Sequence, residues 1–182
     1  MIYTAYRFNT PEFQRMLKYP VELWRGQTLD DDDIMVFEGG QDVSPCIYGE
    51  INTASHTCFE RDMEELVALV SAWNAGARLF GVCRGHQFIH AALGGKLVQN
   101  ICPAHWMTHP VVGLDNLVNS YHHQGVIIPG NIPDVINVYW WHDVLEMFIS
   151  KRVLSVQFHP EYARDGLGWF TDIYKEWEAN GR

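Results

Sequence analysis

A cysteine between two glycines has the setting that most favours nucleophilic chemistry in this chain. Cys83 stands at the centre of Gly81-Val82-Cys83-Arg84-Gly85, where an apolar run ends and a helical pattern begins. Such a strand-to-helix turn, a nucleophile elbow, strains the backbone of the nucleophile, and the glycines remove side chains that would clash. The N–H groups of the following helix, with a nearby imidazolium, would favour the thiolate. Taken alone, the short pattern is equally compatible with a buried core cysteine.

A histidine and a carboxylate that could complete a catalytic triad occur near the other end of the chain. An apolar run ends at His159, and Glu161 follows two residues later. The imidazole would exchange a proton with the nucleophile, while the carboxylate on its far side fixes its tautomer and stabilises the imidazolium. Pro160 predicts a rigid, extended relation between the two. In isolation, a strand-end histidine beside a surface glutamate is the commoner explanation.

A glycine turn supplies candidate hydrogen-bond donors for an oxyanion. Gly39 and Gly40 follow the apolar run 34–37, and ligands of parallel sheets bind at the carboxyl ends of the strands. The backbone N–H of either glycine could form an oxyanion hole together with the N–H of Arg84. A simple turn is the alternative for this motif, and the side chain of Arg84 could simply cover the elbow.

The elements that must position these residues alternate between strand-like and helical patterns. This alternation is typical of βα units around a mainly parallel sheet. Strands are predicted at 2–8, 21–24, 34–37, 77–82, 135–141, 144–149 and 153–158, the last two forming a hairpin that turns at 151–152. Helices are predicted from Thr10 as N-cap to Pro20, and at 60–74, 87–93 and 169–177. The acidic run 30–33 is predicted to be a solvated loop.

Two helices carry apolar stripes that predict which face is buried. In each, apolar residues recur at three- and four-residue spacings, the pattern of a helix packed on a core. The stripe of the first consists of Met63, Leu66, Val67, Val70 and Trp73, and that of the second of Trp169, Phe170, Ile173, Tyr174 and Trp177.

Several motifs in fixed order resemble the class I glutamine amidotransferase superfamily, with wording closest to its γ-glutamyl hydrolase branch, the γ-glutamyl-GABA hydrolase type. The segments that carry the resemblance are E-G-G-Q-D-V-S-P-C-I-Y-G-E from Glu38, R-D-M-E-E-L from Arg61, G-V-C-R-G-H-Q from Gly81, V-N-S-Y-H-H-Q from Val118 and V-Q-F-H-P-E from Val156. The resemblance implies a flavodoxin-like three-layer α/β/α fold with a mainly parallel central sheet, formed by a single domain over residues 1–182.

The resemblance also implies roles for individual residues. Cys83 would attack the side-chain amide of glutamine or of a γ-glutamyl amide, and a γ-glutamyl thioester would form. His159 would protonate the leaving ammonia or amine and then activate water, with Glu161 orienting it. Gly39 or Gly40 and Arg84 would donate to the oxyanion. The residues that match the family's substrate-holding positions are Gln87, Tyr121, His122 and His123.

Composition excludes several other classes of protein. The net charge of −9 leaves no basic excess for binding nucleic acid. Arg7, Pro11 and Glu12 interrupt any leader-like start, and no apolar run is long enough to span a membrane, so a cytoplasmic protein is expected. The four cysteines, Cys46, Cys58, Cys83 and Cys102, show no C-x-x-C spacing, which predicts reduced thiols. No cofactor is expected.

The histidines raise the alternative of a metal site. The candidates are His105, His109, His122, His123 and His142. His109 follows His105 by one helical turn, but Pro110 disfavours a helix there, and no cysteine or carboxylate in the pattern completes a tetrahedral ligand set. The sequence therefore predicts no metal ion.

Two enzymatic functions and one non-enzymatic function remain open. The chain is shorter than γ-glutamyl-GABA hydrolases usually are and looks trimmed between Gly95 and Val118, and its size favours a glutaminase that passes ammonia to a separate synthase. The wording of the motifs favours instead a stand-alone hydrolase of γ-glutamyl amines or peptides. An inactive binding or scaffolding relative is the third possibility, although such proteins normally lack a triad residue.

Overall fold

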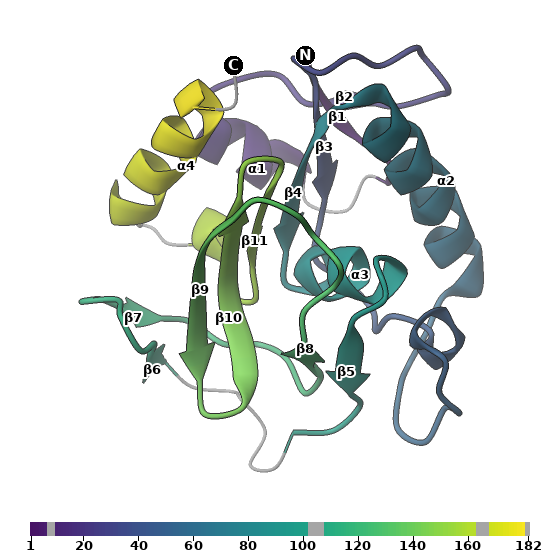
Figure 1. The fold of residues 1–182 in the computed structure, drawn as a ribbon, viewed down its shortest axis with the longest axis vertical. Coiled ribbons are helices and arrows are strands. Elements are labelled where there is room, and N and C mark those ends of the chain that lie inside the picture. The colour runs from purple at the N-terminus through teal and green to yellow at the C-terminus, as the bar shows by residue number, and fades with distance from the viewer. Residues whose placement is uncertain (7–9, 102–107, 163–167, 181–182) are drawn as a thin grey trace.

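A seven-stranded sheet forms the middle layer of the computed structural model, which describes residues 1–6, 10–101, 108–162 and 168–180 (Figure 1). The strands, in spatial order, are β2 (Glu22–Leu23), β1 (Ile2–Thr4), β3 (Ile34–Phe37), β4 (Arg78–Val82), β11 (Val153–Val156), β10 (Val144–Ser150) and β9 (Val135–Trp141). The first five are mutually parallel, whereas β10 runs antiparallel to both of its neighbours, β11 and β9. Crossover connections therefore place a helix against each face of the parallel part.

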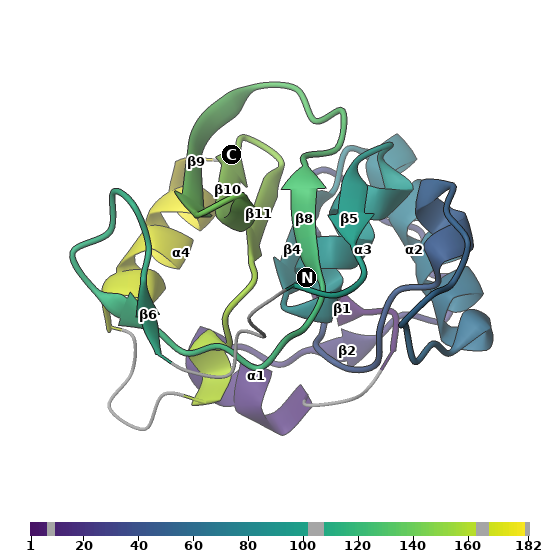
Figure 2. The same cartoon turned by 90° about the horizontal axis from the view of Figure 1, so that it is seen from below.

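Helices cover both faces of this sheet (Figure 2). Helices α2 (Phe59–Ala75) and α3 (Arg84–Ala92) pack on one face, and α1 (Thr10–Leu17) and α4 (Gly168–Asn180) on the other. Successive strand residues point to opposite faces, so Leu79 packs with the first pair of helices and Phe80 with the second. The three-layer α/β/α architecture predicted from the sequence is confirmed.

Smaller elements lie at the carboxyl-terminal edge of the parallel strands. Strand β5 (Lys96–Val98) pairs antiparallel with β8 (Gly125–Ile128), and β6 (His109–Pro110) pairs antiparallel with β7 (Leu117–Val118). Two 3-10 turns, η1 (Pro45–Tyr48) and η2 (Pro160–Tyr162), follow β3 and β11. The sequence predicted none of these elements, because short strands and single turns carry no periodicity of their own.

Most predicted elements are present with shifted bounds. Strand β3 has the predicted bounds, the β10–β11 hairpin turns at 151–152 as predicted, and α3 begins three residues earlier than predicted. The first strand ends at Thr4, and residues 7 and 8 of the predicted 2–8 strand lie outside the described residues. The predicted core face of α4 is confirmed in its main part, since Phe170, Tyr174 and Trp177 are buried.

The predicted core face of α2 is confirmed for Leu66 and Trp73, which pack against the core, and is wrong for the other three residues. Met63, Val67 and Val70 are between 41% and 56% exposed. The helix instead buries two acidic residues, one arginine and three small or aliphatic residues, namely Asp62, Glu65, Arg61, Ala68, Leu69 and Ala72. Charged side chains can lie inside only when they are paired, and those of α2 are paired with an arginine of α3 described below.

The acidic run 30–33 is only partly solvated. Asp30, Asp31 and Asp32 are exposed, as predicted. Asp33 is buried, and its carboxylate accepts the N–H of Asp30 at 3.0 Å. This side chain closes the turn that leads into β3, which explains why it differs from its neighbours. In the described ranges, no helix combines the length and the apolar character that a membrane crossing requires.

The fold predicts that Gly85 cannot carry a side chain. A Cβ at this position would lie 1.9 Å from the carbonyl oxygen of Phe37, because α3 begins directly against the end of β3. We expect Gly85→Ala to lower the free energy of unfolding by about 3 kcal/mol or more, at or above the upper end of the usual overpacking cost. Urea denaturation followed by circular dichroism measures this change.

Gly168→Ala is the matched control, because a Cβ at this position of α4 meets no atom within 4 Å. That substitution should leave stability unchanged or raise it by up to about 1 kcal/mol. Equal stability of the two variants would contradict the described contact between α3 and β3.

Candidate active site

The backbone of Cys83 has the conformation of a nucleophile elbow. Its φ of 52° and ψ of −106° are rare for a residue with a side chain, and it forms the N-cap of α3. Its N–H donates to the carbonyl of Val156 at 2.8 Å, which connects the elbow to the end of β11. Only 6% of the residue is exposed. A conformation that costs about 1–3 kcal/mol persists because the surrounding contacts fix it.

His159 and Glu161 form a hydrogen-bonded pair beside the thiol. Nδ1 of His159 lies 2.7 Å from Oε1 of Glu161, whose side chain is buried. The predicted extended relation between them is wrong, because Pro160–Tyr162 forms the 3-10 turn η2 and folds the carboxylate back onto the ring. Since the carboxylate accepts the Nδ1 proton, Nε2 is the ring nitrogen left for proton transfer with Cys83.

The pKa of His159 is raised to about 10. Burial alone would lower it, but the negative charge and hydrogen bond of Cys83 and those of Glu161 outweigh burial. The partly exposed ring of Tyr162 stacks on the imidazole at a centroid distance of 4.9 Å. The site therefore favours an imidazolium at His159 throughout the neutral pH range.

Two polar side chains that the sequence analysis missed contact His159 and Cys83. Asn119 donates from Nδ2 to the carbonyl of His159 and accepts the His159 N–H at Oδ1, both at 2.8 Å. Nε2 of Gln157 lies 3.7 Å from the Sγ of Cys83 as a donor. Both residues belong to motifs that carried the family resemblance, and this was the available signal, but spacing alone does not show which motif residue reaches which group.

The glycine turn lies against His159 and Cys83. A Cβ on Gly39 would be 2.9 Å from Cε1 of His159 and 3.9 Å from Cβ of Cys83. The N–H of Arg84 belongs to the first turn of α3, where helix geometry provides no internal acceptor. The turn and the helix terminus therefore approach Cys83 together, as the predicted oxyanion hole requires.

Buried ion pairs behind the turn fix its position. The guanidinium of Arg84 pairs with Asp62 and with Glu65. Arg61 pairs with Glu65 at 3.0 Å and donates to the carbonyls of Glu38 and Gly39 at 3.1 and 3.0 Å. The Arg84 side chain thus lies inside the protein and connects α3 to α2.

The predicted substrate-holding residues do not all lie at the thiol. Tyr121 is 57% exposed, and its ring centroid is 6.0 Å from that of His159. Gln87 is buried and donates to the Gln124 carbonyl and to Gln157, both at 3.0 Å. His123 lies 2.9 Å from the Asp42 carboxylate. Their roles in binding substrate stay predictions.

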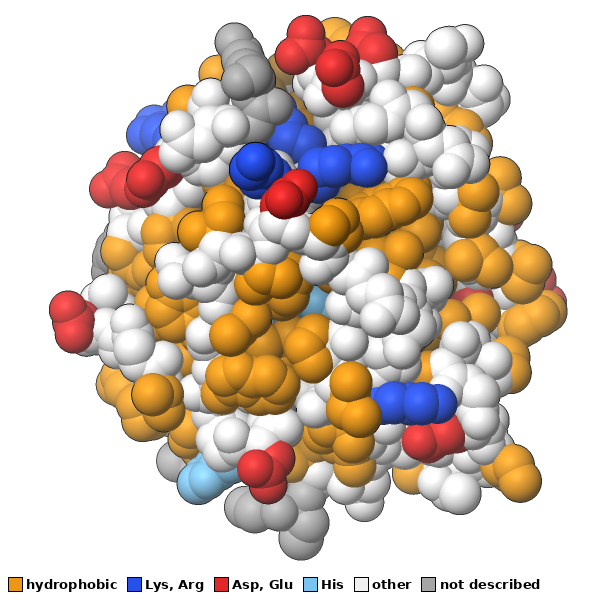
Figure 3. Space-filling model, in the orientation of Figure 1, with side chains coloured by type: hydrophobic (Ala, Val, Ile, Leu, Met, Phe, Trp, Pro, Cys, Tyr) orange, Lys and Arg blue, Asp and Glu red, His pale blue; other side chains and the backbone are white. Residues whose placement is uncertain are grey.

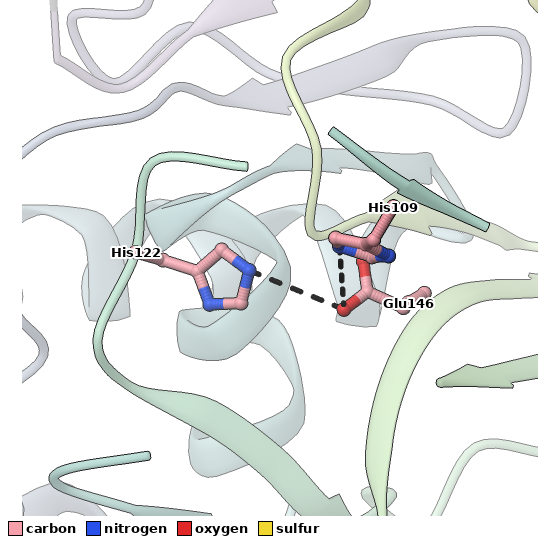
Figure 4. Close-up of side chains that lie close together, drawn as sticks. All are labelled: His109, His122 and Glu146. Carbon is pink, nitrogen blue, oxygen red and sulfur yellow. Dashed lines mark ion pairs between the residues drawn. The ribbon is translucent and has the colours of Figure 1, made fainter. Parts of the chain in front are cut away.

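The fourth of these residues, His122, lies in a different cluster. It faces His109 and Glu146 (Figure 4), and the three ligand atoms lie within 4.8 Å of one another. Burial raises the pKa of Glu146 to about 8. The sequence analysis missed this carboxylate, because Glu146 lies within an apolar strand and has no spacing to the histidines. His105 lies outside the described residues.

A protein-family model and several named proteins match the sequence of this chain. The model of the Peptidase C26 family matches residues 22–112. The chain is 29% identical over 174 residues to a Mycobacterium tuberculosis protein named "Putative glutamine amidotransferase", covering 81% of this chain and 56% of that protein. It is 28% identical over 141 residues to the carbamoyl phosphate synthase small chain of Pectobacterium atrosepticum, covering 73% of this chain and 33% of that one.

A solved structure shows the same fold. A glutamine amidotransferase from Thermotoga maritima superposes with a TM-score of 0.65 at 12% identity, covering 96% of this chain and 82% of that chain. Of the two relatives matched by sequence, the chain spans little more than half of the M. tuberculosis protein and a third of the synthase small chain.

The imidazolium of His159 beside Cys83 predicts a reactive thiol. Iodoacetamide should alkylate Cys83 rapidly at pH 7, and His159→Ala should slow this about tenfold or more, because an ordinary cysteine is only a few per cent thiolate at that pH. Peptide mapping by mass spectrometry separates the sites.

Cys46, an exposed free thiol in the same chain, is the internal control and should react at the same rate in both proteins. Unchanged alkylation of Cys83 in the variant would show that His159 does not act on the thiol.

Proposed function

Because this chain belongs to the Peptidase C26 family of the class I glutamine amidotransferase superfamily, we propose that it hydrolyses a γ-glutamyl amide, with glutamine as the substrate. The observation that carries the proposal is the elbow cysteine at φ 52° beside a histidine held 2.7 Å from a buried carboxylate. We propose further that the released ammonia passes to a partner synthase.

In the first half of the reaction, the thiolate of Cys83 attacks the side-chain amide carbon. The carbonyl oxygen becomes an oxyanion, which accepts hydrogen bonds from the N–H of Gly39 or Gly40 and from that of Arg84. His159 gives its Nε2 proton to the amide nitrogen, the C–N bond breaks, and ammonia leaves a γ-glutamyl thioester on Cys83.

In the second half, water replaces ammonia. The now neutral His159 takes a proton from water as the oxygen attacks the thioester carbon. The C–S bond breaks, glutamate leaves, and Cys83 returns as a thiolate beside the imidazolium. Glu161 stabilises the imidazolium at both stages through the bond to Nδ1.

The exposed apolar stripe of α2, formed by Phe59, Met63, Val67 and Val70, supports the proposal of a partner. Figure 3 shows apolar side chains over α2 at the right edge of the drawn face. The stripe begins two residues from Arg61, which contacts the glycine turn at the site. Relatives named for synthases, including the aminodeoxychorismate synthase component 2 of Escherichia coli, support the same reading.

A stand-alone γ-glutamyl-amine hydrolase is the second candidate. The match to the Peptidase C26 family and the wording of the motifs favour it. An inactive scaffold is the third possibility, and the assembled Cys83, His159 and Glu161 argue against it.

Substrate assays separate these functions. The purified chain should release glutamate from glutamine slowly, and Cys83→Ala should reduce this by at least about 10³-fold, since the nucleophile is lost. Cys46→Ala, which removes an exposed thiol, is the control and should leave the rate unchanged.

Rapid release of glutamate from γ-glutamyl-GABA by the chain alone would establish the stand-alone hydrolase and remove the partner from the proposal. No Cys83-dependent release from either substrate would overturn the triad itself.

Replacing Asn119 should lower kcat and leave KM nearly unchanged. Asn119→Ala removes both bonds to the backbone of His159, and a displacement near 1 Å can cost about 10²-fold in rate. We expect kcat for glutamine hydrolysis to fall by about 10- to 100-fold with KM nearly unchanged, as steady-state kinetics would measure. Asn119→Asp keeps the acceptor and loses the donor, so its kcat should lie between that of the parent chain and that of Asn119→Ala. An effect confined to KM would assign Asn119 to substrate binding instead.

A further inference from the structure

Three potential metal ligands converge from separate segments of the chain (Figure 4). His109 comes from β6, His122 from the segment before β8, and Glu146 from the centre of β10. Oε1 of Glu146 lies 3.7 Å from Nε2 of His109 and 4.0 Å from Nε2 of His122. All three side chains are buried.

The hydrogen bonds of the two imidazoles fix their tautomers. Nδ1 of His109 lies 3.0 Å from the carbonyl of Pro110, and Nδ1 of His122 lies 2.8 Å from that of Gln124. A carbonyl oxygen only accepts, so each Nδ1 carries the proton, and a neutral ring presents the lone pair of Nε2 toward Glu146. A metal-binding histidine typically has this arrangement, with the other ring nitrogen donating to a backbone carbonyl.

The surroundings hold His109 in place and favour its neutral ring, the form that binds a cation. Burial lowers the pKa of His109, against the opposing effect of its bond to Pro110, and so favours the neutral ring. The ring of Trp141 stacks on His109 at a centroid distance of 3.8 Å and holds its orientation. A buried carboxylate is costly as a bare anion, and a cation among these groups would offset that cost.

We propose that His109, His122 and Glu146 bind one divalent transition-metal ion, with Zn²⁺ as the best match. Two imidazole nitrogens and a carboxylate oxygen are a known protein ligand set for Zn²⁺ that leaves a fourth position for water. Tetrahedral bonds of about 2.1 Å place ligand atoms about 3.4 Å apart. The separations of 3.7 and 4.0 Å from Glu146 would therefore shrink by about 0.3 and about 0.6 Å on binding.

The ion would connect this cluster to the candidate active site. The carbonyl of Gln124 accepts both Nδ1–H of His122 and Nε2–H of Gln87, a residue of α3 one turn beyond Cys83. Tyr121, directly before His122, lies beside the ring of His159. Binding at His122 would thus brace the 121–124 segment against β10, next to the catalytic pair.

Zinc titration tests the proposal without depending on activity. We would use the full chain with Cys83→Ala, because a catalytic thiol beside an imidazole could bind zinc by itself. After chelator treatment and dialysis, isothermal titration calorimetry should show one Zn²⁺ per chain. Co²⁺ in place of Zn²⁺ should give the strong visible absorption of a tetrahedral site.

Matched variants locate the ion. In that background, Glu146→Gln and His109→Ala should each weaken Zn²⁺ binding by about 100-fold or more, above the range for loss of an outer-shell partner. They should also abolish the rise in melting temperature that Zn²⁺ causes. His56→Ala, which removes an exposed histidine elsewhere, should bind as the parent does.

No stoichiometric Zn²⁺ binding, or undiminished binding by Glu146→Gln, would overturn the proposal. Glu146→Gln keeps the shape of the side chain and therefore decides the question if His109→Ala fails to fold. Because the titration uses Cys83→Ala, failure of the zinc site leaves the proposed hydrolase untouched, and the converse also holds.

Discussion

The buried ion pairs between α2 and α3 are the interaction on which the geometry of the site depends. Arg84 of α3 pairs with Asp62 and Glu65 of α2 directly beside the elbow. Arg61, also of α2, donates hydrogen bonds to carbonyls of the glycine turn. The carboxylate of Asp62 accepts the N–H of Ser44 at 3.0 Å. Desolvating these charges is expensive unless every charge has good partners. One set of contacts therefore fixes the turn, the elbow and the helix between them.

The same ion pairs explain why the buried face of α2 could not be predicted from the sequence. Apolar spacing places Met63, Val67 and Val70 in the core, and they are exposed. Arg84 is 19 residues from its partner Glu65, so no local pattern reveals the pairing that permits Asp62 and Glu65 to be buried. The strands β3, β4, β10 and β11 were predictable because apolar residues dominate their runs, as is typical of strands buried on both faces.

The candidate site shows the same division between local and long-range information. Cys83, His159 and Glu161 could be found because each lies in a short motif whose order matches a family. Asn119 and Gln157 reach the pair only through the folded chain, 40 residues from His159 and 74 residues from Cys83. Glu146 is hidden within the apolar strand β10, and only the sheet brings it to His109 and His122. The 3-10 turn at Pro160 was missed because proline is compatible with both an extended chain and a first helical position.

The proposed chemistry requires opposite charges in a buried site, and backbone groups supply much of the compensation for those charges. The N-terminus of α3 faces the thiol with the positive end of its dipole. The carbonyl and N–H of His159 are both bound by Asn119, so the ring keeps its place whichever proton state it holds. Glu161 then opposes the effect of burial on the imidazolium. In this arrangement the backbone of Cys83 has a strained φ. The hydrogen bond from its N–H to β11 and the close packing of α3 on β3 maintain that strain.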